Sequence, residues 1–376
     1  MIFSKNTVKG ILFTLGIIAS FLSVYIGFKN AMTYSVDFQW SPAVTFWSGI
    51  DPYSVALSID RNKYIILTQD PNYLHGLYLL FFPLAKLNFE QAKLTWVILN
   101  ILFGFGCLYL AYKIYSLSVK QLIITGIIFL CSAPFRNCLG NGQQTLMILF
   151  FLLMYWHHKN KFRGVSLFMV GLKYSFAPIF FLRSMLKKEM AFYVAIALIL
   201  ISAFLFSIKI NQKLNFHLLI SPLLVAQSKT SFGFSDIYSF IKDYTNFSFY
   251  ISIAIPLSFT ALLIFWDLKF DNPYKLSILC LFSLLLFYHL IYDYVFMLPL
   301  IAQSLKRQKS QSIFLNTTIF FCLSYFMFIH TIIFRFKLHD SDLLKWIGFL
   351  LMAGTSLSLM FTYSRKKSIN KLQESE

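Results

Sequence analysis

The sequence has few charged side chains, and acidic ones are the scarcest. Of its 376 residues, 15 are Asp or Glu and 33 are Lys or Arg, while 58% are hydrophobic. A soluble domain of this length needs a larger charged surface. Apolar runs long enough to cross a bilayer recur at 11–28, 94–112, 190–208 and 310–334. We predict an all-α polytopic membrane protein with about 10–12 transmembrane segments, two of them broken or re-entrant.

The cysteine content excludes two further classes of protein. The five cysteines lie in or beside apolar runs without paired spacing, so they predict neither a disulfide framework nor a metal site. The sequence also has no HExxH pattern and no phosphate-cradling glycine loop. We therefore expect no metal and no cofactor, and we see no soluble domain that could hold a sugar nucleotide.

The net charge of +18 does not indicate nucleic-acid binding, because the basic residues form short clusters between apolar runs. Such clusters are typical of cytoplasmic loops under the positive-inside rule. They lie at 157–163, 183–188, 306–309 and 365–367.

Placing these clusters in the cytoplasm gives a predicted topology for one transmembrane domain, 1–376. Both termini are then cytoplasmic, with an uncleaved first helix and a cytoplasmic tail at 364–376. Residues 29–92 form an extracytoplasmic loop with interfacial helices, and 209–245 form a second one. Residues 73–87 are predicted to lie on the outer surface, because the stretch is short and contains His75, Pro83 and Lys86.

Two apolar segments, 164–182 and 276–304, each lie between basic clusters that should both be inside. Each has a polar interruption near its middle, at 171–175 and 289–293. A helix that rises, breaks and returns would place each interruption toward the outer side. Irregular backbone at membrane depth is tolerated where it is buried in protein or lines a polar cavity.

The predicted topology collects polar and ionisable residues on the outer side. Ionisable groups at membrane depth cost about 2.5–3.5 kcal/mol each, so a functional role is their first hypothesis. Lys173 is the hardest to explain structurally, because it lies midway through an apolar segment. Structural alternatives stay open for the others: Asp37 as a helix cap or loop acid, Asp51 in a turn, Arg136 reaching the interface, Asn141 and Gln143 as helix caps, and His289 with Asp293 as a buried pair.

Several short motifs occur in a fixed order over residues 30–300. They are Val36-Asp37-Phe38, Trp47-Ser48-Gly49-Ile50-Asp51-Pro52-Tyr53, Tyr73-Leu74-His75-Gly76-Leu77, Asn141-Gly142-Gln143-Gln144-Thr145, Gly171-Leu172-Lys173 and Tyr288-His289 with Asp293-Tyr294. This order resembles the GT-C glycosyltransferases, and specifically glycosyltransferase family 87, the polyprenol-phosphate-sugar-dependent mannosyl- and arabinosyltransferase-like enzymes.

The resemblance implies an inverting enzyme of the plasma membrane, with its active site on the outer side. Its donor would be a polyprenyl-phosphate sugar, and its acceptor a glycolipid or polysaccharide of the cell envelope. Asp37 would be the general base, and Arg136, Lys173 and His289 would surround the phosphate, with Asn141 and Gln143 as helix-end donors. Weaker candidates are Asp51, Tyr53, His75 and Asp293.

The sequence departs from the family pattern in two places. Prolines are usual where His75-Gly76 stand, and a proline usually follows the lysine, where this chain has Tyr174. These departures leave the sugar open. A transporter or flippase of lipid-linked saccharides is the main alternative, and a non-catalytic assembly subunit is another. An enzyme would place Asp37 and the cations around one outward cavity with a lateral opening to lipid.

Overall fold

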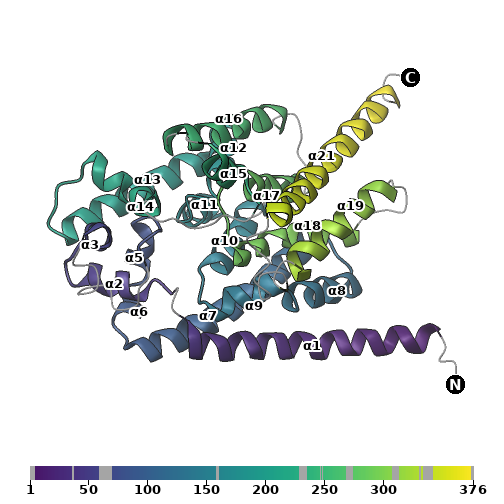
Figure 1. Ribbon diagram of the computed structural model, residues 1–376, viewed down its shortest axis with the longest axis horizontal. Coiled ribbons are helices and arrows are strands. Elements are labelled where there is room, and N and C mark those ends of the chain that lie inside the picture. The colour runs from purple at the N-terminus through teal and green to yellow at the C-terminus, as the bar shows by residue number, and fades with distance from the viewer. Residues whose placement is uncertain are drawn as a thin grey trace.

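The computed structural model describes most of the chain as helices, with no β-strand among the described residues (Figure 1). The described residues are 5–35, 38–58, 70–157, 161–227, 235–245, 247, 249–267, 274–306, 313–329, 332 and 342–373.

Four described helices are long and apolar enough to cross a membrane. They are α1 (Lys5–Tyr34), α7 (Phe89–Tyr115), α13 (Met190–Lys209) and α21 (Asp342–Gln373). A bent pair, α8 (Val119–Leu130) and α9 (Ala133–Gly140), raises the number to five if it counts as one span. The predicted all-α polytopic class is confirmed.

Shorter apolar helices make up several of the other predicted segments. They are α10 (Thr145–Trp156), α16 (Phe249–Asp267), α17 (Tyr274–Leu286) and α19 (Ile313–Ser324), which continues into the π-helix η2 (Tyr325–Ile329). The predicted number of 10–12 segments counted these shorter helices as well as the long ones. A further short apolar helix, α14 (Phe216–Gln227), lies within the predicted second outer loop.

The bend between α8 and α9 falls at residues 131–132. The two axes differ by 59°. Ser132 caps α9 by accepting a hydrogen bond from Phe135 N, and Pro134 occupies the first turn. A proline has no N–H to continue the preceding helix, and it favours a new helix start at this position.

The first predicted broken element consists of α11 (Arg163–Gly171) and α12 (Pro178–Leu186), separated by a break at 172–177. Its two ends lie together, because Arg163 and Arg183 both bind the Glu189 carboxylate, at 3.0 and 3.4 Å. The segment therefore leaves one end of the molecule and returns to it.

The second broken element consists of α17, the 3₁₀ helix η1 (Ile291–Met297) and α18 (Leu298–Lys306), with its break at 287–290. It touches the first break directly. The Ser283 hydroxyl donates to the Phe176 carbonyl at 3.0 Å, and the Phe176 and Phe296 rings stack with centroids 3.5 Å apart. The two irregular segments are therefore buried against each other.

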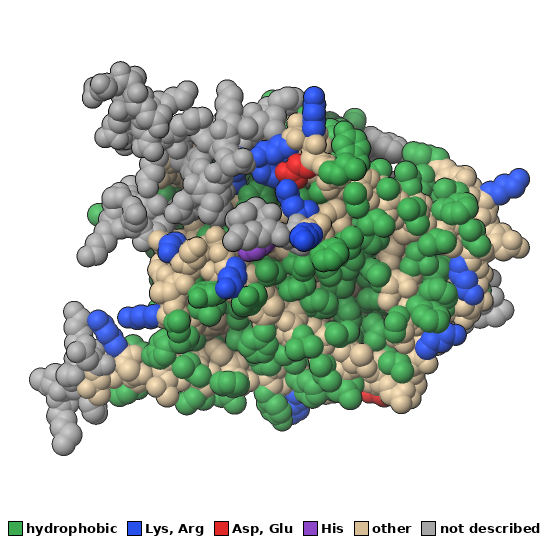
Figure 2. Space-filling view, turned by 180° about the vertical axis from the view of Figure 1, so that it is seen from behind, with side chains coloured by type: hydrophobic (Ala, Val, Ile, Leu, Met, Phe, Trp, Pro, Cys, Tyr) green, Lys and Arg blue, Asp and Glu red, His purple; other side chains and the backbone are tan. Residues whose placement is uncertain are grey.

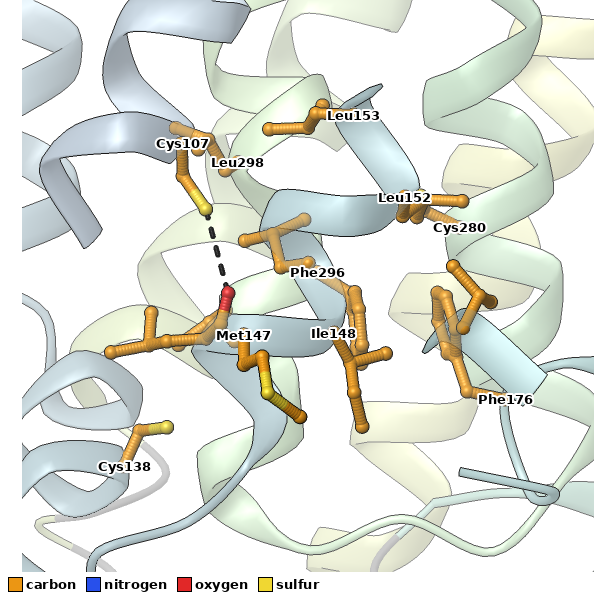
Figure 3. Packing of buried hydrophobic residues seen from close by; sticks show 14 of the residues in the cluster. Cys107, Cys138, Met147, Ile148, Leu152, Leu153, Phe176, Cys280, Phe296 and Leu298 are labelled. Atoms are coloured by element: carbon orange, nitrogen blue, oxygen red, sulfur yellow. Dashed lines mark hydrogen bonds between the residues drawn. The ribbon is translucent and has the colours of Figure 1, made fainter. Parts of the chain in front are cut away.

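Helix α10 runs through the centre of the hydrophobic core (Figure 3). Its Met147, Ile148, Leu152 and Leu153 are buried among residues of other helices and of the two breaks. The labelled neighbours are Cys107, Cys138, Phe176, Cys280, Phe296 and Leu298. The first residue of α10, Thr145, is thereby held in a fixed position.

Different elements lie at the two ends of the molecule. The start of α1 and the end of α21 lie at one end of its long axis, and the short helices α2 (Trp40–Trp47), α3 (Pro52–Leu57), α5 (Gly76–Leu80) and α6 (Phe82–Ala85) lie with α14 at the other (Figure 1). Helix α15 (Ile237–Tyr244) lies further inward, against α16 and α17. Hydrophobic side chains cover much of the described lateral surface between the two ends (Figure 2).

Candidate active site

One buried carboxylate, that of Asp293, gathers polar groups from three parts of the chain. Its Oδ1 atom lies 2.7 Å from Lys173 Nζ and accepts from Thr145 Oγ1 at 3.0 Å. Its Oδ2 atom lies 3.4 Å from His289 Nδ1 and accepts from Leu290 N at 3.2 Å. The side chains of Lys173 and Asp293 are 10% and 3% exposed. We call Lys173, His289, Asp293 and Thr145 the central cluster.

The two helix breaks determine where these side chains lie. Lys173 follows α11 in a turn closed by hydrogen bonds from Phe176 N and Ala177 N to its carbonyl. His289 lies between α17 and η1, and Asp293 is in the first turn of η1. If 276–304 formed one unbroken helix, His289 and Asp293 would lie on its regular surface and would not converge on Lys173.

The His289 ring lies between two oxygen acceptors. Its Nε2 atom lies 2.8 Å from the Ser283 carbonyl oxygen. Its Nδ1 atom lies 3.4 Å from the Asp293 carboxylate, which also binds the Lys173 ammonium. The central cluster therefore places an ammonium group and an imidazole ring on one carboxylate.

Asp236 is a further acid beside the cluster that sequence analysis missed. It is 1% exposed, and it caps α15 by accepting from Ser239 N and Ser239 Oγ at 2.7 and 2.9 Å. Burial raises the pKa of Asp236 to about 6, and Ser239 and the nearby His289 oppose the rise. The only sequence signal was a capping pattern, Ser235-Asp236 before Ser239, in a loop that otherwise reads as apolar.

The Tyr73 and Tyr292 rings lie close to the lysine ammonium, with Nζ 5.9 and 5.3 Å from their ring centroids. Leu74 N donates to the Leu172 carbonyl at 3.2 Å, which fixes the 70–75 segment against the first break. Aromatic rings at these distances stabilise a cation. The two rings also form a hydrophobic surface beside the charge.

Asp51 and Tyr53 help to position the segment that carries Tyr73. Asp51 caps α3 by accepting from Tyr53 N at 2.9 Å and from the Ser54 hydroxyl at 2.5 Å. The Tyr53 hydroxyl donates to the Tyr73 carbonyl at 2.6 Å. Both residues therefore position the 70–75 segment, and their described contacts are structural.

His75 is buried between aromatic rings. Its Nε2 donates to the Leu218 carbonyl at 3.0 Å, and its ring meets those of Tyr53 and Phe206 edge-on. Burial lowers the pKa of His75 to about 4, so the side chain is neutral at pH 7. It lies outside the candidate spans and ties α5 to α14.

Arg136, Asn141 and Gln143 occupy α9 and the turn that joins it to α10. The Arg136 guanidinium donates to the Cys131 carbonyl at 2.5 Å and to Ser23 Oγ of α1 at 3.3 Å. Asn141 and Gln143 donate through their backbone N–H groups to carbonyls of α9. This turn leads directly to Thr145, so these residues support the central cluster from the side of α10.

Asp37 lies outside the described residues, but its neighbour Phe38 is held by the same turn. The Gln144 amide donates to the Phe38 carbonyl at 3.0 Å, and the Phe38 and Trp96 rings stack at 5.8 Å. Trp96 Nε1 in turn donates to the Gly142 carbonyl at 2.7 Å. A continuous set of contacts thus leads from Phe38, through the turn, to Thr145 and Asp293.

The model of glycosyltransferase family 87 matches residues 76–217 of the chain. The chain carries a glycosyltransferase family 87 region. The resemblance predicted from the sequence is confirmed over this stretch, and the match indicates a glycosyltransferase in a chain with several helices long and apolar enough to cross a membrane. No curated protein and no solved structure matches the chain.

The family 87 region contains four of the predicted site residues, Arg136, Asn141, Gln143 and Lys173. Asp37 precedes the region, and His289 and Asp293 follow it. The fold therefore brings residues from outside the matched stretch onto its lysine. Chemically, a buried ammonium and a buried imidazole ring share one carboxylate in this cluster.

Proposed function

We propose that this glycosyltransferase moves a mannose- or arabinose-like sugar from a polyprenyl-phosphate donor to a glycolipid or glycan acceptor on the outer side of the plasma membrane, with inversion. The observation that carries the proposal is the central cluster. The buried Lys173 ammonium and the buried His289 ring, which this proposal takes as protonated, lie in a region with an apolar lateral surface, and such a region suits a phosphate carried on a lipid.

The charges of the reaction explain why cations are needed. The donor phosphodiester carries one negative charge. The acceptor hydroxyl oxygen forms a bond to the anomeric carbon as the bond from that carbon to the phosphate oxygen breaks. The electron pair leaves with the polyprenyl phosphate, whose charge rises toward two. Lys173 and His289 therefore interact more strongly with the transition state than with the donor.

The proton of the acceptor hydroxyl needs a base, and we assign this role to Asp37. One carboxylate is sufficient, since the phosphate departs as a stabilised anion and needs no acid, unlike the leaving group in glycoside hydrolysis. Support comes from the contacts that attach Phe38 to the turn before Thr145. Arg136, Asn141 and Gln143 would then hold this turn in place.

The decisive experiment supplies purified protein in lipid with a panel of radiolabelled polyprenyl-phosphate sugars and a membrane extract as acceptor. Wild type and Asp37→Asn are compared at matched abundance. Transfer by wild type alone supports both the donor class and the base. Transfer that persists in Asp37→Asn removes Asp37 from this role.

A separate binding measurement tests the phosphate site. Lys173→Ala should weaken donor binding, while the same donor should bind wild type and Asp37→Asn alike. Unchanged affinity in Lys173→Ala would make the lysine structural. Absence of transfer with every donor, together with movement of lipid-linked saccharide across vesicles, would replace the enzyme by a transporter.

A further inference from the structure

Gln144, the residue before Thr145, has a buried side-chain oxygen without a hydrogen-bond partner. The residue is 0% exposed and directly precedes α10. Its Nε2 atom donates to the Phe38 carbonyl at 3.0 Å, and this contact fixes the orientation of the carboxamide, because a carbonyl can only accept. Within the part of the chain that the structure describes, its Oε1 atom makes no hydrogen bond. Buried acceptors in native proteins almost always have a donor, so the donor to this oxygen has to be identified.

Two other glutamines show how a structural carboxamide is bound in this protein. Gln39 donates to a backbone carbonyl at 2.9 Å and accepts from the Tyr78 hydroxyl at 2.9 Å. Gln121 donates to the Leu305 carbonyl at 2.6 Å and accepts from a backbone N–H at 2.8 Å. Each of these side chains uses both ends within the protein. Gln144 uses only its nitrogen in this way, so its oxygen can accept from a ligand.

The position of Gln144 indicates which ligand could supply the donor. Its carboxamide binds Phe38, which follows the proposed base Asp37. The next residue, Thr145, donates to the Asp293 carboxylate at the proposed phosphate site. In the proposed reaction the anomeric carbon lies between the acceptor oxygen, which is at the base, and the phosphate oxygen, which is at the cations. The transferred sugar is therefore the part of the substrate that would lie beside Gln144.

Ser35 provides a second unpaired polar atom in the same region. Its hydroxyl is buried and makes no hydrogen bond in the described part of the chain. A Cβ placed on Gly142 would lie 2.6 Å from this hydroxyl oxygen and 3.5 Å from Phe38 Cβ. Both unpaired atoms thus lie where the segment that follows α1 packs against the turn before α10. Asn100 and Gln303 also have unpaired amide atoms, but they belong to α7 and α18.

We infer that Gln144 is a sugar-binding residue whose Oε1 atom accepts a hydrogen bond from one hydroxyl group of the transferred sugar. This inference rests on the proposed function and assigns a residue to the choice of sugar. A sugar with this hydroxyl pairs the buried oxygen, whereas a sugar without it leaves the oxygen unpaired. Thr145 and His289 are 0% and 1% exposed, so the whole site is enclosed and the sugar reaches Gln144 when the site opens to admit the donor.

The test compares a donor with its monodeoxy analogues, each of which lacks one sugar hydroxyl. The probe is short-chain polyprenyl-phosphate mannose, or the corresponding arabinose donor if wild type transfers arabinose instead. The measured quantity is kcat/KM for each deoxy donor relative to that for the parent donor. Wild type should lose about 10- to 100-fold with one of the deoxy donors, because that donor leaves Gln144 Oε1 unpaired.

Gln144→Met should remove this selectivity, because methionine has a similar length and its sulfur is only a weak acceptor. The variant also loses the hydrogen bond to the Phe38 carbonyl, so kcat/KM should fall for every donor, and the ratio cancels this common loss. The deoxy donor that wild type discriminates against should then be transferred as well as the parent donor. Gln144→Asn keeps the amide and withdraws its oxygen by one carbon, so it should lose the same selectivity. Thermal unfolding of each variant checks the fold.

Gln121→Met is the matched control, since it makes the same substitution at a glutamine whose carboxamide is bound at both ends within the protein. It should keep the wild-type profile of deoxy donors. If no single hydroxyl matters to wild type, Oε1 accepts from buried water only and the inference fails. It also fails if Gln144→Met and Gln144→Asn keep the wild-type selectivity. If wild type transfers neither sugar from any parent donor, the proposed function fails, and this inference fails with it.

Discussion

Lys173 and Asp293 form an ion pair with a 2.7 Å separation, although each comes from a different interruption of an apolar segment. Neither residue could reach the other from a continuous helix face, and both would be costly to bury alone. The pair therefore explains why both segments break. Thr145 and His289 complete the surroundings of the same carboxylate.

Removing one member of this pair should destabilise the protein strongly. Asp293→Ala leaves the Lys173 ammonium buried without its partner, and we expect a loss of about 3–5 kcal/mol in the free energy of unfolding. The double variant Lys173→Met with Asp293→Asn removes both charges and should recover most of this loss. Denaturant unfolding in detergent measures both. A double variant as unstable as Asp293→Ala would show that the pair is not the cause.

The sequence allowed the helical class, the two broken segments and the lysine to be predicted, because each follows from local composition. A charged residue within an apolar run can be recognised from the sequence alone. The partner of Lys173 was harder to predict, because Asp293 is one of several acidic residues and the contact joins segments that are distant in the sequence. Asp236 was missed because its burial depends on packing against α21 and the second break, which no local pattern encodes.

The turn before α10 illustrates the same limit. Asn141 and Gln143 were predicted to donate to the substrate from a helix end, whereas their described hydrogen bonds shape the turn itself. Gly142, which lies between them, is the most constrained residue of this turn. Gly142 has φ of 67°, and a Cβ there would lie 2.6 Å from Ser35 Oγ.

Gly142→Ala should therefore lower stability by about 1–3 kcal/mol, from the left-handed backbone and the crowded hydroxyl together. Gly354→Ala in α21 is the matched control, because a Cβ there meets nothing within 4 Å; it should be neutral or stabilising by up to about 1 kcal/mol. Adding Ser35→Ala to Gly142→Ala should restore only the steric part. Equal stability of the two glycine variants would contradict this account.

His75 should make the protein sensitive to acid. Its pKa is lowered to about 4, while the unfolded chain keeps the ordinary value of about 6.5. Between these values the unfolded state binds the extra proton, so stability falls as pH drops from 6.5 to 4 and changes no further through this group. The full effect is about 3 kcal/mol.

His75→Gln keeps a donor for the Leu218 carbonyl and removes the titration. Its free energy of unfolding should therefore fall by about 3 kcal/mol less than that of wild type between pH 7 and pH 4. Unfolding curves at four or five pH values give the difference directly. Parallel pH profiles for the two proteins would mean that His75 keeps its ordinary pKa in the folded state.

The orientation of the chain has a paired test at two exposed lysines. Lys161 belongs to a basic cluster that we predict to be cytoplasmic, and Lys213 lies in the second predicted outer loop. A membrane-impermeant thiol reagent added to intact cells should label Lys213→Cys and leave Lys161→Cys unlabelled until the cells are opened. Four of the native cysteines are buried and Cys131 is partly buried, which keeps the background labelling low.

Arg163 and Arg183 both contact Glu189, so the two ends of the first broken element lie on the same side of the membrane whichever way the chain is inserted. The opposite labelling pattern would therefore invert the predicted topology and place the loop at 29–92, with α3 and α5, in the cytoplasm.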